Sequence, residues 1–479
     1  MTGLAAEIRT AGRGGFSGHS SMDVPDVRGT RVPRVPCRSR QGRADRSGED
    51  AARAGTHGTI HSADRKAGRR GPGRPLPIRQ GRNIAGLQPF GMTVAFQKTK
   101  EPFLSSTANI RHIEALTAMR GLAAILVVIF HYSGGFLPNF TPSQYTAFLS
   151  KGYLWVDFFF LLSGYVMAHA YAADFRDRAS AGTVRKFIFA RFSRIYPLHL
   201  AILLAFLLLE LVKLLLISFG IGQASFPVFE GARSVESLAS NVLLLQTTGL
   251  HDGLTWNGPA WSIGAEWFAY LAFPILVVGI MKRGMVASSL MIALSLLGLA
   301  LLSGMGDNLD VTYDYGILRC LFGFVIGMVL HRFLGLATRL RLGSDAAAIA
   351  LLALTGVLMH AGVRDIAIPP VFALLILSLS LNNGRVSRGL SHPALVWLGT
   401  ISYSVYLSHM LILSVINVVS VTMLGKPVGR FLETGPSLLL LAGLVGLVIA
   451  LSGWLYVNVE ARARSALQKS RFARRHVYR

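Results

Sequence analysis

The sequence predicts an all-α integral membrane protein with about ten transmembrane helices and with both chain termini in the cytoplasm. Hydrophobic residues make up 52% of its 479 residues, and the mean hydropathy of +0.48 is far above that of a typical soluble protein. Several apolar runs reach the roughly 20 residues that a helix needs to cross a bilayer. Lys and Arg recur in alternate connections between these runs, which is the pattern of the positive-inside rule.

Residues 1–91 form a different kind of sequence, rich in Gly, Arg, Ser and Pro and without sustained apolar periodicity. They contain 17 Lys and Arg against 7 Asp and Glu, and so carry +10 of the total net charge of +24. This composition predicts a disordered basic extension that lacks the apolar core of a secretory signal peptide. Its arginines would contact anionic lipid or nucleic acid only nonspecifically, so no specific nucleic-acid partner is expected.

Met92 begins a segment that leads directly into the first apolar run. We therefore expect translation of the native protein to start near Met92, and residues 92–111 to be a cytoplasmic lead-in. A ten-helix membrane domain is predicted over residues 112–460, followed by a basic cytoplasmic tail at 461–479. The predicted helices lie near residues 116–135, 153–172, 195–218, 260–281, 285–303, 315–334, 346–361, 367–382, 396–423 and 436–458.

The connections between the predicted helices determine their orientation. Positive charge is concentrated after the second helix, then in every second connection, and again after the last helix. By the positive-inside rule these segments are cytoplasmic, while connections poor in Lys and Arg, such as residues 304–314, face outward. The residues that carry this signal are Arg176, Arg178, Arg185, Lys186, Arg191, Lys282, Arg283, Arg332, Arg339, Arg341, Arg385, Arg388, Arg462, Arg464, Lys469, Arg471, Arg474 and Arg475.

The first predicted helix carries two ionisable residues, Arg120 near its cytoplasmic end and His131 in its outer half. Eleven residues bring the helix back to within about 20° of the starting direction, with a rise of about 16 Å. Both side chains therefore share one face, which should point into the bundle or a watery cavity because hydrocarbon offers them no partner. Taken alone, Arg120 could equally be an Arg that snorkels from a helix end, and His131 could equally be a His that is hydrogen-bonded within the helix bundle, with no functional role for either.

Two acidic residues are predicted at the depth of His131. Asp157 lies among aromatic residues near the outer end of the second helix, and Glu266 follows Ser262 by four residues on one side of the fourth. A carboxylate beside a His would hold its tautomer and raise its basicity, so Asp157 and Glu266 are candidate catalytic residues with His131. A structural hydrogen bond for Asp157 and a buried pair with an Arg for Glu266 remain alternatives.

The third helix opens with Arg191 and Arg194, three residues apart on one face at the cytoplasmic boundary. Topological anchoring would explain both, but Arg120 is expected at the same depth. Grouped guanidinium groups suit phosphate, so these three arginines are candidates for substrate binding. Deeper in the same helix, Glu210 and Lys213 are expected to satisfy each other.

The ninth helix places Ser402, Tyr406 and His409 at i, i+4 and i+7, so they line one face. This pattern fits the polar wall of a substrate pocket and equally fits ordinary hydrogen bonds between helices. No group of His, Asp and Glu has the spacing of metal ligands, and no metal or bound cofactor is expected. The two cysteines, Cys37 and Cys320, indicate neither a disulfide framework nor a zinc site.

Several of these motifs together resemble the acyltransferase-3 family of integral membrane O-acyltransferases, over about residues 110–460. Each motif is weak alone, but five in the same order are a strong signal. The matching stretches are Arg120 to His131 as R-x10-H, DFFFLLSGYV at 157–166, RFSRIYPLH at 191–199, WSIGAEWFAY at 261–270 and ISYSVYLSH at 401–409. The sequence departs from the Glu-x-Pro ending usual in that family, with Glu460, Ala461 and Arg462 there instead.

The resemblance implies transfer of an acyl group, commonly acetyl, from acyl-coenzyme A to a carbohydrate hydroxyl, with Arg120 and His131 essential. The family modifies bacterial exopolysaccharides, lipopolysaccharide O-antigens, nodulation factors and some antibiotics. The resemblance therefore implies a carbohydrate or glycolipid acceptor and a multi-pass protein of the bacterial cytoplasmic (inner) membrane. Trp261 and Ser262, in the fourth motif, join the candidates for substrate binding. The arginines would hold the phosphates of a cytosolic acyl-CoA while His131 removes the proton from the acceptor hydroxyl.

Two other classes of function remain open from the sequence. A transporter or flippase of glycans or lipid-linked sugars would also have about ten spans with polar faces, but it is expected to show internal repeats or paired broken helices, and the sequence shows neither. An acyl-lipid-binding or sensory protein without turnover is the third class. A transfer assay with labelled acetyl-CoA separates the three.

Overall fold

The computed structural model describes residues 107–133, 136–140, 142–175, 179–221, 228–306 and 308–478. Every regular element in these ranges is helical, as the all-α prediction requires. The predicted extension at 1–91 lies outside the described residues. The first helix, α2, begins at Thr107, within the segment predicted as the cytoplasmic lead-in.

Most of the long helices follow the predicted apolar runs. The largest exception is α4, which begins 14 residues before the predicted start at 195, so Arg185, Lys186 and Arg191 lie within the helix and not in a connection. Their bounds are α2 Thr107–Ser133, α3 Trp155–Tyr171, α4 Ala181–Ser218, α6 Ala260–Met281, α7 Met285–Met305, α8 Gly316–Leu330, α10 Asp345–His360, α11 Ile368–Leu381, α14 Ser402–Leu424 and α15 Thr434–Leu455. By length and composition, eight helical stretches in the described part are able to cross a membrane. One of them, Gly316–Arg339, joins α8 to the short helical segments that follow it, whereas α10 and α11 are shorter than all eight. At 16 and 14 residues, these two reach only about 24 and 21 Å, less than the roughly 30 Å of a hydrocarbon core.

Shorter helices that the apolar pattern does not predict fill the connections. They are α5 Val235–Val242, α9 Leu334–Arg339, α12 Arg385–Leu390, α13 Pro393–Thr400 and α16 Ala461–Lys469, with a π-helical segment, η7, at Tyr456–Glu460. The ninth predicted helix, 396–423, is in fact two helices, because the chain turns at Ile401 between α13 and α14.

The outward faces of the long helices are apolar, as a lipid-facing surface must be. On α7 the exposed side chains include Leu290, Leu294, Leu297 and Leu301, which follow the spacing of one helix face. A soluble protein rarely exposes such a stripe, because it gains nothing by leaving large apolar groups in water. The stripe therefore supports membrane embedding independently of the hydropathy.

Hydrogen bonds and ion pairs between the connections group them at two ends of the bundle. At one end, Asp365 accepts a hydrogen bond from Leu309 N at 2.8 Å and forms an ion pair with Lys151. At the other end, Asp345 accepts from Arg385 N at 2.7 Å. The first set consists of connections predicted to face outward and the second of connections predicted to be cytoplasmic, so the contacts agree with the predicted alternation.

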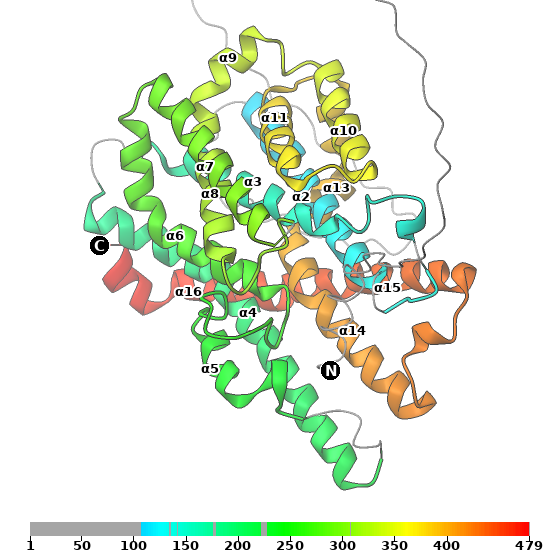
Figure 1. The fold of residues 1–479 in the computed structure, drawn as a ribbon. Helices are drawn as coiled ribbons and strands as arrows, with labels where there is room; N and C mark the ends of the chain where they lie inside the picture. Colours follow the sequence, from blue (N-terminus) through cyan, green and yellow to red (C-terminus); the bar gives the residue numbers. More distant parts are fainter. Residues whose placement is uncertain are drawn as a thin grey trace, which may run out of the picture. The chain divides into compact units, whose positions relative to one another are not determined.

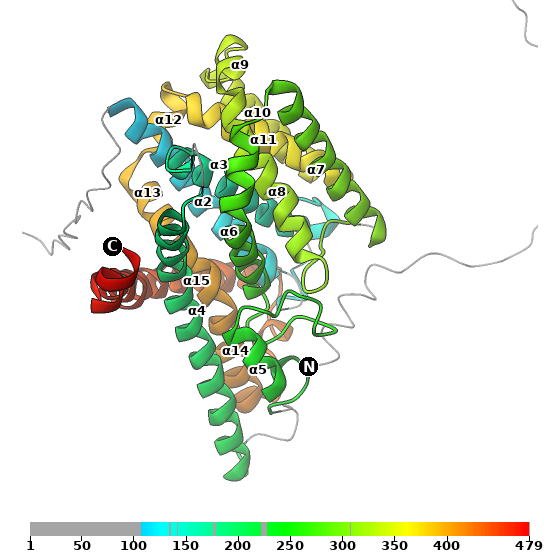
Figure 2. The same ribbon diagram turned by 90° about the vertical axis from the view of Figure 1, so that its left-hand side faces the viewer.

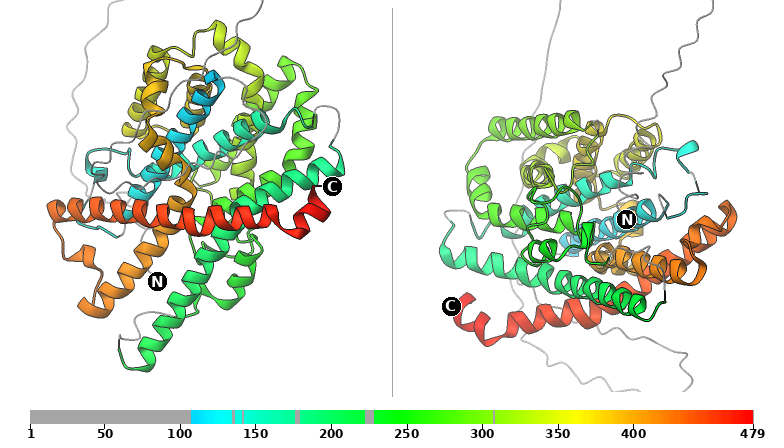
Figure 3. Two further views of the ribbon diagram at one scale, coloured as in Figure 1. Left: turned by 180° about the vertical axis from the view of Figure 1, so that it is seen from behind. Right: turned by 60° about the horizontal axis from the view of Figure 1, so that its bottom comes forward.

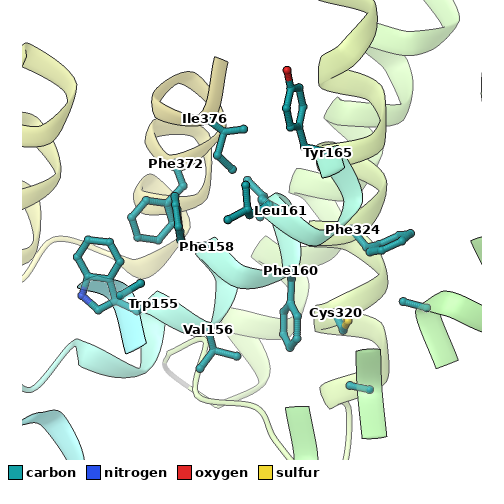
Figure 4. Close-up of a cluster of buried hydrophobic side chains, with 14 of the residues drawn as sticks. Trp155, Val156, Phe158, Phe160, Leu161, Tyr165, Cys320, Phe324, Phe372 and Ile376 are labelled. Carbon is teal, nitrogen blue, oxygen red and sulfur yellow. The ribbon is translucent and has the colours of Figure 1, made fainter. Parts of the chain in front are cut away.

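The centre of the bundle is the contact between α3 and α8, with α11 on the other side of α3. Figure 4 shows Phe158 and Leu161 of α3 between Phe372 of α11 and Phe324 of α8. Glycine makes the α3–α8 approach possible, since a Cβ on Gly327 would lie 1.9 Å from the Leu161 carbonyl oxygen. Small residues at such points let membrane helices approach closely, and close packing is what holds them together in lipid.

Adding a methyl group at this contact should therefore destabilise the protein. We expect Gly327→Ala to lower the free energy of unfolding by about 1–3 kcal/mol, measured as a lower thermal-unfolding midpoint in detergent. Gly443→Ala in α15 is the matched control, because a Cβ there meets no heavy atom within 4 Å. Equal stability of the two variants would show that the α3–α8 contact is not tightly packed.

Helix α2 lies between α3 on one side and α13 and α14 on the other (Figures 1 and 2). Its approach to α13 is as close as that of α3 to α8, because a Cβ on Gly399 would lie 1.9 Å from the Thr117 carbonyl oxygen, and one on Gly121 would lie 2.6 Å from Gly399 N. This approach places the backbone around Gly399 beside Arg120, which lies between Thr117 and Gly121 on α2.

Helices α15 and α16 run end to end through η7 along one side of the bundle, and α4 crosses them (Figure 3). Contacts join α4 to both η7 and α16. The segment after α16 also packs on α4, since the Phe189 ring lies 6.3 Å from Phe472 and 6.5 Å from Tyr478. The predicted basic tail is thus folded against the helix that carries Arg191 and Arg194.

Candidate functional site

Two histidines from helices far apart in sequence meet inside the bundle. His131, near the end of α2, is half-buried, and His409 of α14 is fully buried. Nε2 of His409 lies 3.3 Å from Nδ1 of His131, with the ring centroids 5.0 Å apart. Tyr132 helps to fix the pair, because its hydroxyl donates to the His409 carbonyl oxygen at 2.7 Å.

The surrounding carbonyls assign the tautomers of the two rings. Nδ1 of His131 lies 2.9 Å from the Val127 carbonyl oxygen, and Nδ1 of His409 lies 3.3 Å from that of Val405. A carbonyl only accepts, so each Nδ1 carries the proton in the neutral ring. The single Nδ1–H of His131 is then shared between the Val127 carbonyl oxygen and Nε2 of His409, and Nε2 of His131 is left with a lone pair. The arrangement prepares His131 to act as a base.

The prediction that a carboxylate orients His131 is wrong for both acidic candidates. Asp157 is buried in a bidentate pair with Arg319 of α8, whose Nη2 and Nε lie 2.7 and 3.0 Å from its two oxygens. Glu266 accepts from the Ser163 hydroxyl at 2.6 Å and from the Tyr270 hydroxyl at 2.5 Å. The neighbour of His131 is instead a neutral imidazole.

Arg120 is held at the other end of the polar face of α2. Its Nε donates to the Ser402 hydroxyl at 2.9 Å, and its Nη2 donates to the Gly399 carbonyl oxygen at 2.8 Å. Both partners are neutral, so the charge of Arg120 is not cancelled by a direct ion pair among the described residues. Its charge also interacts with that of Glu266, whose partner Tyr270 has its ring centroid 6.0 Å from the Arg191 guanidinium carbon.

The three predicted arginines come together. The charge of Arg194 interacts with those of Arg120 and Arg191. Arg191 donates to the Tyr171 hydroxyl at 2.9 Å, and its Nε is buried without an acceptor among the residues that the structure describes. Arg194 forms an ion pair with Glu460. A group of cations with one unmet donor is suited to an anionic ligand.

Glu460 is a site residue that the sequence analysis missed. It is 2% exposed, pairs with Arg194, and accepts from the Ser404 hydroxyl at 2.8 Å. The sequence analysis noted only that the proline of the Glu-x-Pro ending is missing. The glutamate of that ending, Glu460, is the group that contacts the arginine cluster. The signal was available, because an acidic residue at the end of an apolar run needs a cationic partner.

The face of α14 is confirmed as a line of contacts between helices. Ser402 contacts Arg120 and His409 contacts His131, while the Tyr406 hydroxyl lies 2.8 Å from the Ser262 hydroxyl of α6. Ser262 and Tyr406 are both buried. These hydroxyls therefore join α14 to α2 and α6, which is the alternative that the sequence left open for them.

Trp261 contacts Arg319, the partner of Asp157. Its ring is buried, and the Arg319 guanidinium carbon lies 5.4 Å from the ring centroid, a cation–π distance. Arg319 was not singled out from the sequence, although a charge in the first turn of an apolar helix is as strong a signal as Asp157. The predicted Glu210–Lys213 pair is confirmed at 2.8 Å.

Within the described ranges, no group of three or more His, Cys, Asp and Glu side chains is arranged to hold a metal ion. The polar groups of this site are the imidazole pair and the arginine cluster. They lie at the two ends of one face of α2, about 16 Å apart along the helix axis.

Comparison with known proteins agrees with this arrangement. The family model described as an acyltransferase domain, acyltransferase-3, matches residues 113–457. The acyltransferase MdmB of Streptomyces mycarofaciens is 30% identical over 174 residues, which cover 35% of this chain and 40% of that protein. Protein 2 in the picA locus of Rhizobium radiobacter is 32% identical over 162 residues, or 32% of this chain and 75% of that protein. No solved structure matches the chain significantly.

The chain therefore spans less than half the length of the first of these relatives. The family model, however, covers well over half of the chain and includes every helix from α2 to α15 that carries a candidate residue. The protein is thus a multi-pass membrane protein, and it belongs to the acyltransferase-3 family.

Proposed function

We propose that the protein is an O-acyltransferase of the bacterial cytoplasmic membrane, which moves an acyl group, acetyl in the first instance, from acyl-CoA to a hydroxyl of a carbohydrate or glycolipid acceptor such as exopolysaccharide or lipopolysaccharide. The observation that carries this proposal is the single face of α2, with a base at one end and an arginine cluster at the other. Membership of an acyltransferase family supports it and argues against the transporter and the non-catalytic binding protein.

The arginine cluster is the proposed site for the donor phosphates. Among the described residues, Arg120 is bound to neutral groups, Arg191 has an unmet donor, and Glu460 forms an ion pair with Arg194. The excess of positive charge matches the negative charge of the coenzyme A phosphates. The separation of about 16 Å between Arg120 and His131 is comparable to an extended pantetheine arm, so phosphates at one end leave the thioester near the other.

His131 is the proposed general base. Its Nε2 takes the proton of an acceptor hydroxyl while the hydroxyl oxygen attacks the thioester carbonyl carbon. The C–S bond then breaks, the acyl group remains on the oxygen as an ester, and the proton passes from the imidazolium to the departing thiolate. His409 acts as a positioning residue, because its Nε2 accepts from the Nδ1–H of His131 throughout and favours the positive ring in the transition state.

The other predicted residues then have supporting roles in the proposal. Ser402 and Glu266 hold Arg120 by a hydrogen bond and by charge, and Tyr406 with Ser262 keeps α6 against α14. Asp157 and Trp261 surround Arg319. None of these needs to touch the reacting atoms for the chemistry described.

The decisive experiment uses the purified full chain in detergent with radiolabelled acetyl-CoA and candidate glycans. Incorporation of label into a glycan, absent in a His131→Ala control, is the expected result. Release of CoA without any labelled acceptor would show a donor hydrolase. If neither acetyl-CoA nor a longer acyl-CoA binds or reacts, the donor assignment is overturned. Movement of unmodified glycan lipid across reconstituted vesicles would favour a flippase.

Removal of Arg194 tests the donor site. We expect Arg194→Ala to raise KM for acyl-CoA by about 10–100-fold, because a hydrogen bond to a charged group contributes about 1.5–3 kcal/mol. The same change leaves the buried Glu460 carboxylate uncompensated, which should also lower protein abundance.

The double variant Arg194→Ala with Glu460→Gln separates these two effects. It should restore abundance, since the buried charge is gone, while KM for acyl-CoA stays raised. Steady-state kinetics on detergent-purified protein measures both constants. A change confined to kcat in the double variant would argue against phosphate binding by Arg194.

A further inference from the structure

The C-terminal segment, residues 461–479, contributes a side chain to the arginine cluster. Its positive charges were read only as a signal of cytoplasmic location, and that role does not require such a contact. Helix α16 packs on α4, where Arg191 and Arg194 lie. Glu460, just before α16, contacts Arg194, and the Gln468 side chain near its end donates to the Ser193 hydroxyl at 3.4 Å. These two residues lie eight apart, and Arg464 lies midway between them.

The helical spacing places Arg464 on the same face. Positions 460, 464 and 468 follow at four-residue steps, so their side chains form one stripe along the helix. Because the first and last members of this stripe contact residues 194 and 193 of α4, the middle one faces the same part of α4. Arg464 is half-buried, and its charge interacts with that of Arg194.

The charges at this point are not balanced. The charge of Arg194 interacts with those of three other arginines, Arg120, Arg191 and Arg464, and among the described residues Glu460 forms the direct ion pair of this cluster. Holding like charges together is unfavourable unless an anion joins them. The unmet Nε of Arg191 points to the same need.

From this geometry we infer that Arg464 of α16 binds the phosphates at the nucleotide end of the acyl-CoA donor, so that the donor site is formed jointly by α2, α4 and the C-terminal segment. The inference rests on the proposed function, because it names a further residue of the same site. Arg464 lies in α16, which follows α15 and η7 and belongs to the segment predicted as a basic cytoplasmic tail. The part of the donor farthest from the thioester is its phosphorylated nucleotide.

The test compares three acyl donors in the full-length protein: acetyl-CoA, 3′-dephospho-acetyl-CoA and S-acetylpantetheine, which has no nucleotide. We expect Arg464→Gln to raise KM for acetyl-CoA by about 10-fold or more, with kcat little changed, and to leave turnover of S-acetylpantetheine as in the wild type. The matched control is Arg462→Gln, which removes the same charge from an exposed position of the same helix and should behave as the wild type.

The dephospho donor identifies the phosphate that is held. If Arg464→Gln does not change KM for 3′-dephospho-acetyl-CoA, the 3′-phosphate is the partner of Arg464. If it raises this KM as much as it raises KM for acetyl-CoA, the pyrophosphate is the partner. Both results support the inference. It is overturned if Arg464→Gln and Arg462→Gln have equal KM values for acetyl-CoA, or if Arg464→Gln loses turnover of S-acetylpantetheine to the same extent.

These outcomes are separate from a failure of the proposed function. A wild-type protein that neither binds nor uses acetyl-CoA refutes the donor itself. A wild-type protein that uses acetyl-CoA normally, while Arg464→Gln does so equally well, refutes only the role of α16.

Discussion

Replacement of His131 by Ala should reduce acyl transfer by about 10²–10⁴-fold, the usual contribution of a positioned general base, without reducing the amount of folded protein. The imidazole is only half-buried, and its hydrogen bonds go to the Val127 carbonyl and to His409. Its removal therefore leaves no buried charge. The measurement is the initial rate of label transfer per mole of protein, with abundance followed by quantitative immunoblotting of membranes.

An abundant and fully active His131→Ala protein would refute His131 as the base. His409 provides the companion test, since its proposed role is to accept a hydrogen bond from His131. His409→Gln retains a side-chain acceptor and should keep more activity than His409→Leu, with the difference in kcat and not in KM for acyl-CoA. Equal losses in both variants, together with lower abundance, would indicate that His409 only supports the packing of α14.

The fold was largely predictable because hydropathy reports directly on the length of a buried or lipid-facing helix. The predicted helix at 260–281 has the same bounds as α6. The break at Ile401 was not predictable in this way. It depends on the contact of Gly399 with Thr117, a contact 282 residues apart, and the apolar run itself continues through the turn.

The site was predictable in its residue types and not in its pairings. Arg120, Arg191 and Arg194 were expected together because topology places their helix ends at one depth, and depth follows from the sequence. The partner of His131 depends on how α14 is rotated about its own axis, which no local pattern records. Asp157 was assigned to the wrong neighbour because the cation facing it, Arg319, was read as part of an apolar helix.

The pair of Asp157 and Arg319 is the basis of the prediction with the largest effect on stability. Both side chains are 0–1% exposed, and they join α3 to α8 at the most extensive helix contact of the bundle. Arg319 also donates to the carbonyl oxygens of Tyr153 and Val311, at 3.1 and 3.2 Å. It thereby fixes the connections at the end of the bundle predicted to face outward.

Arg319→Met should lower the free energy of unfolding by about 3–5 kcal/mol, because it leaves the Asp157 carboxylate as an unpaired buried charge. Addition of Asp157→Asn to that variant removes the charge and should recover part of the loss, although the two carbonyls still lack their donor. Arg339→Met is the control, since Arg339 is exposed on α9. Thermal unfolding in detergent measures all three. If Arg319→Met were as stable as Arg339→Met, the buried pair would contribute nothing to the α3–α8 contact, and Asp157 would be free for another role.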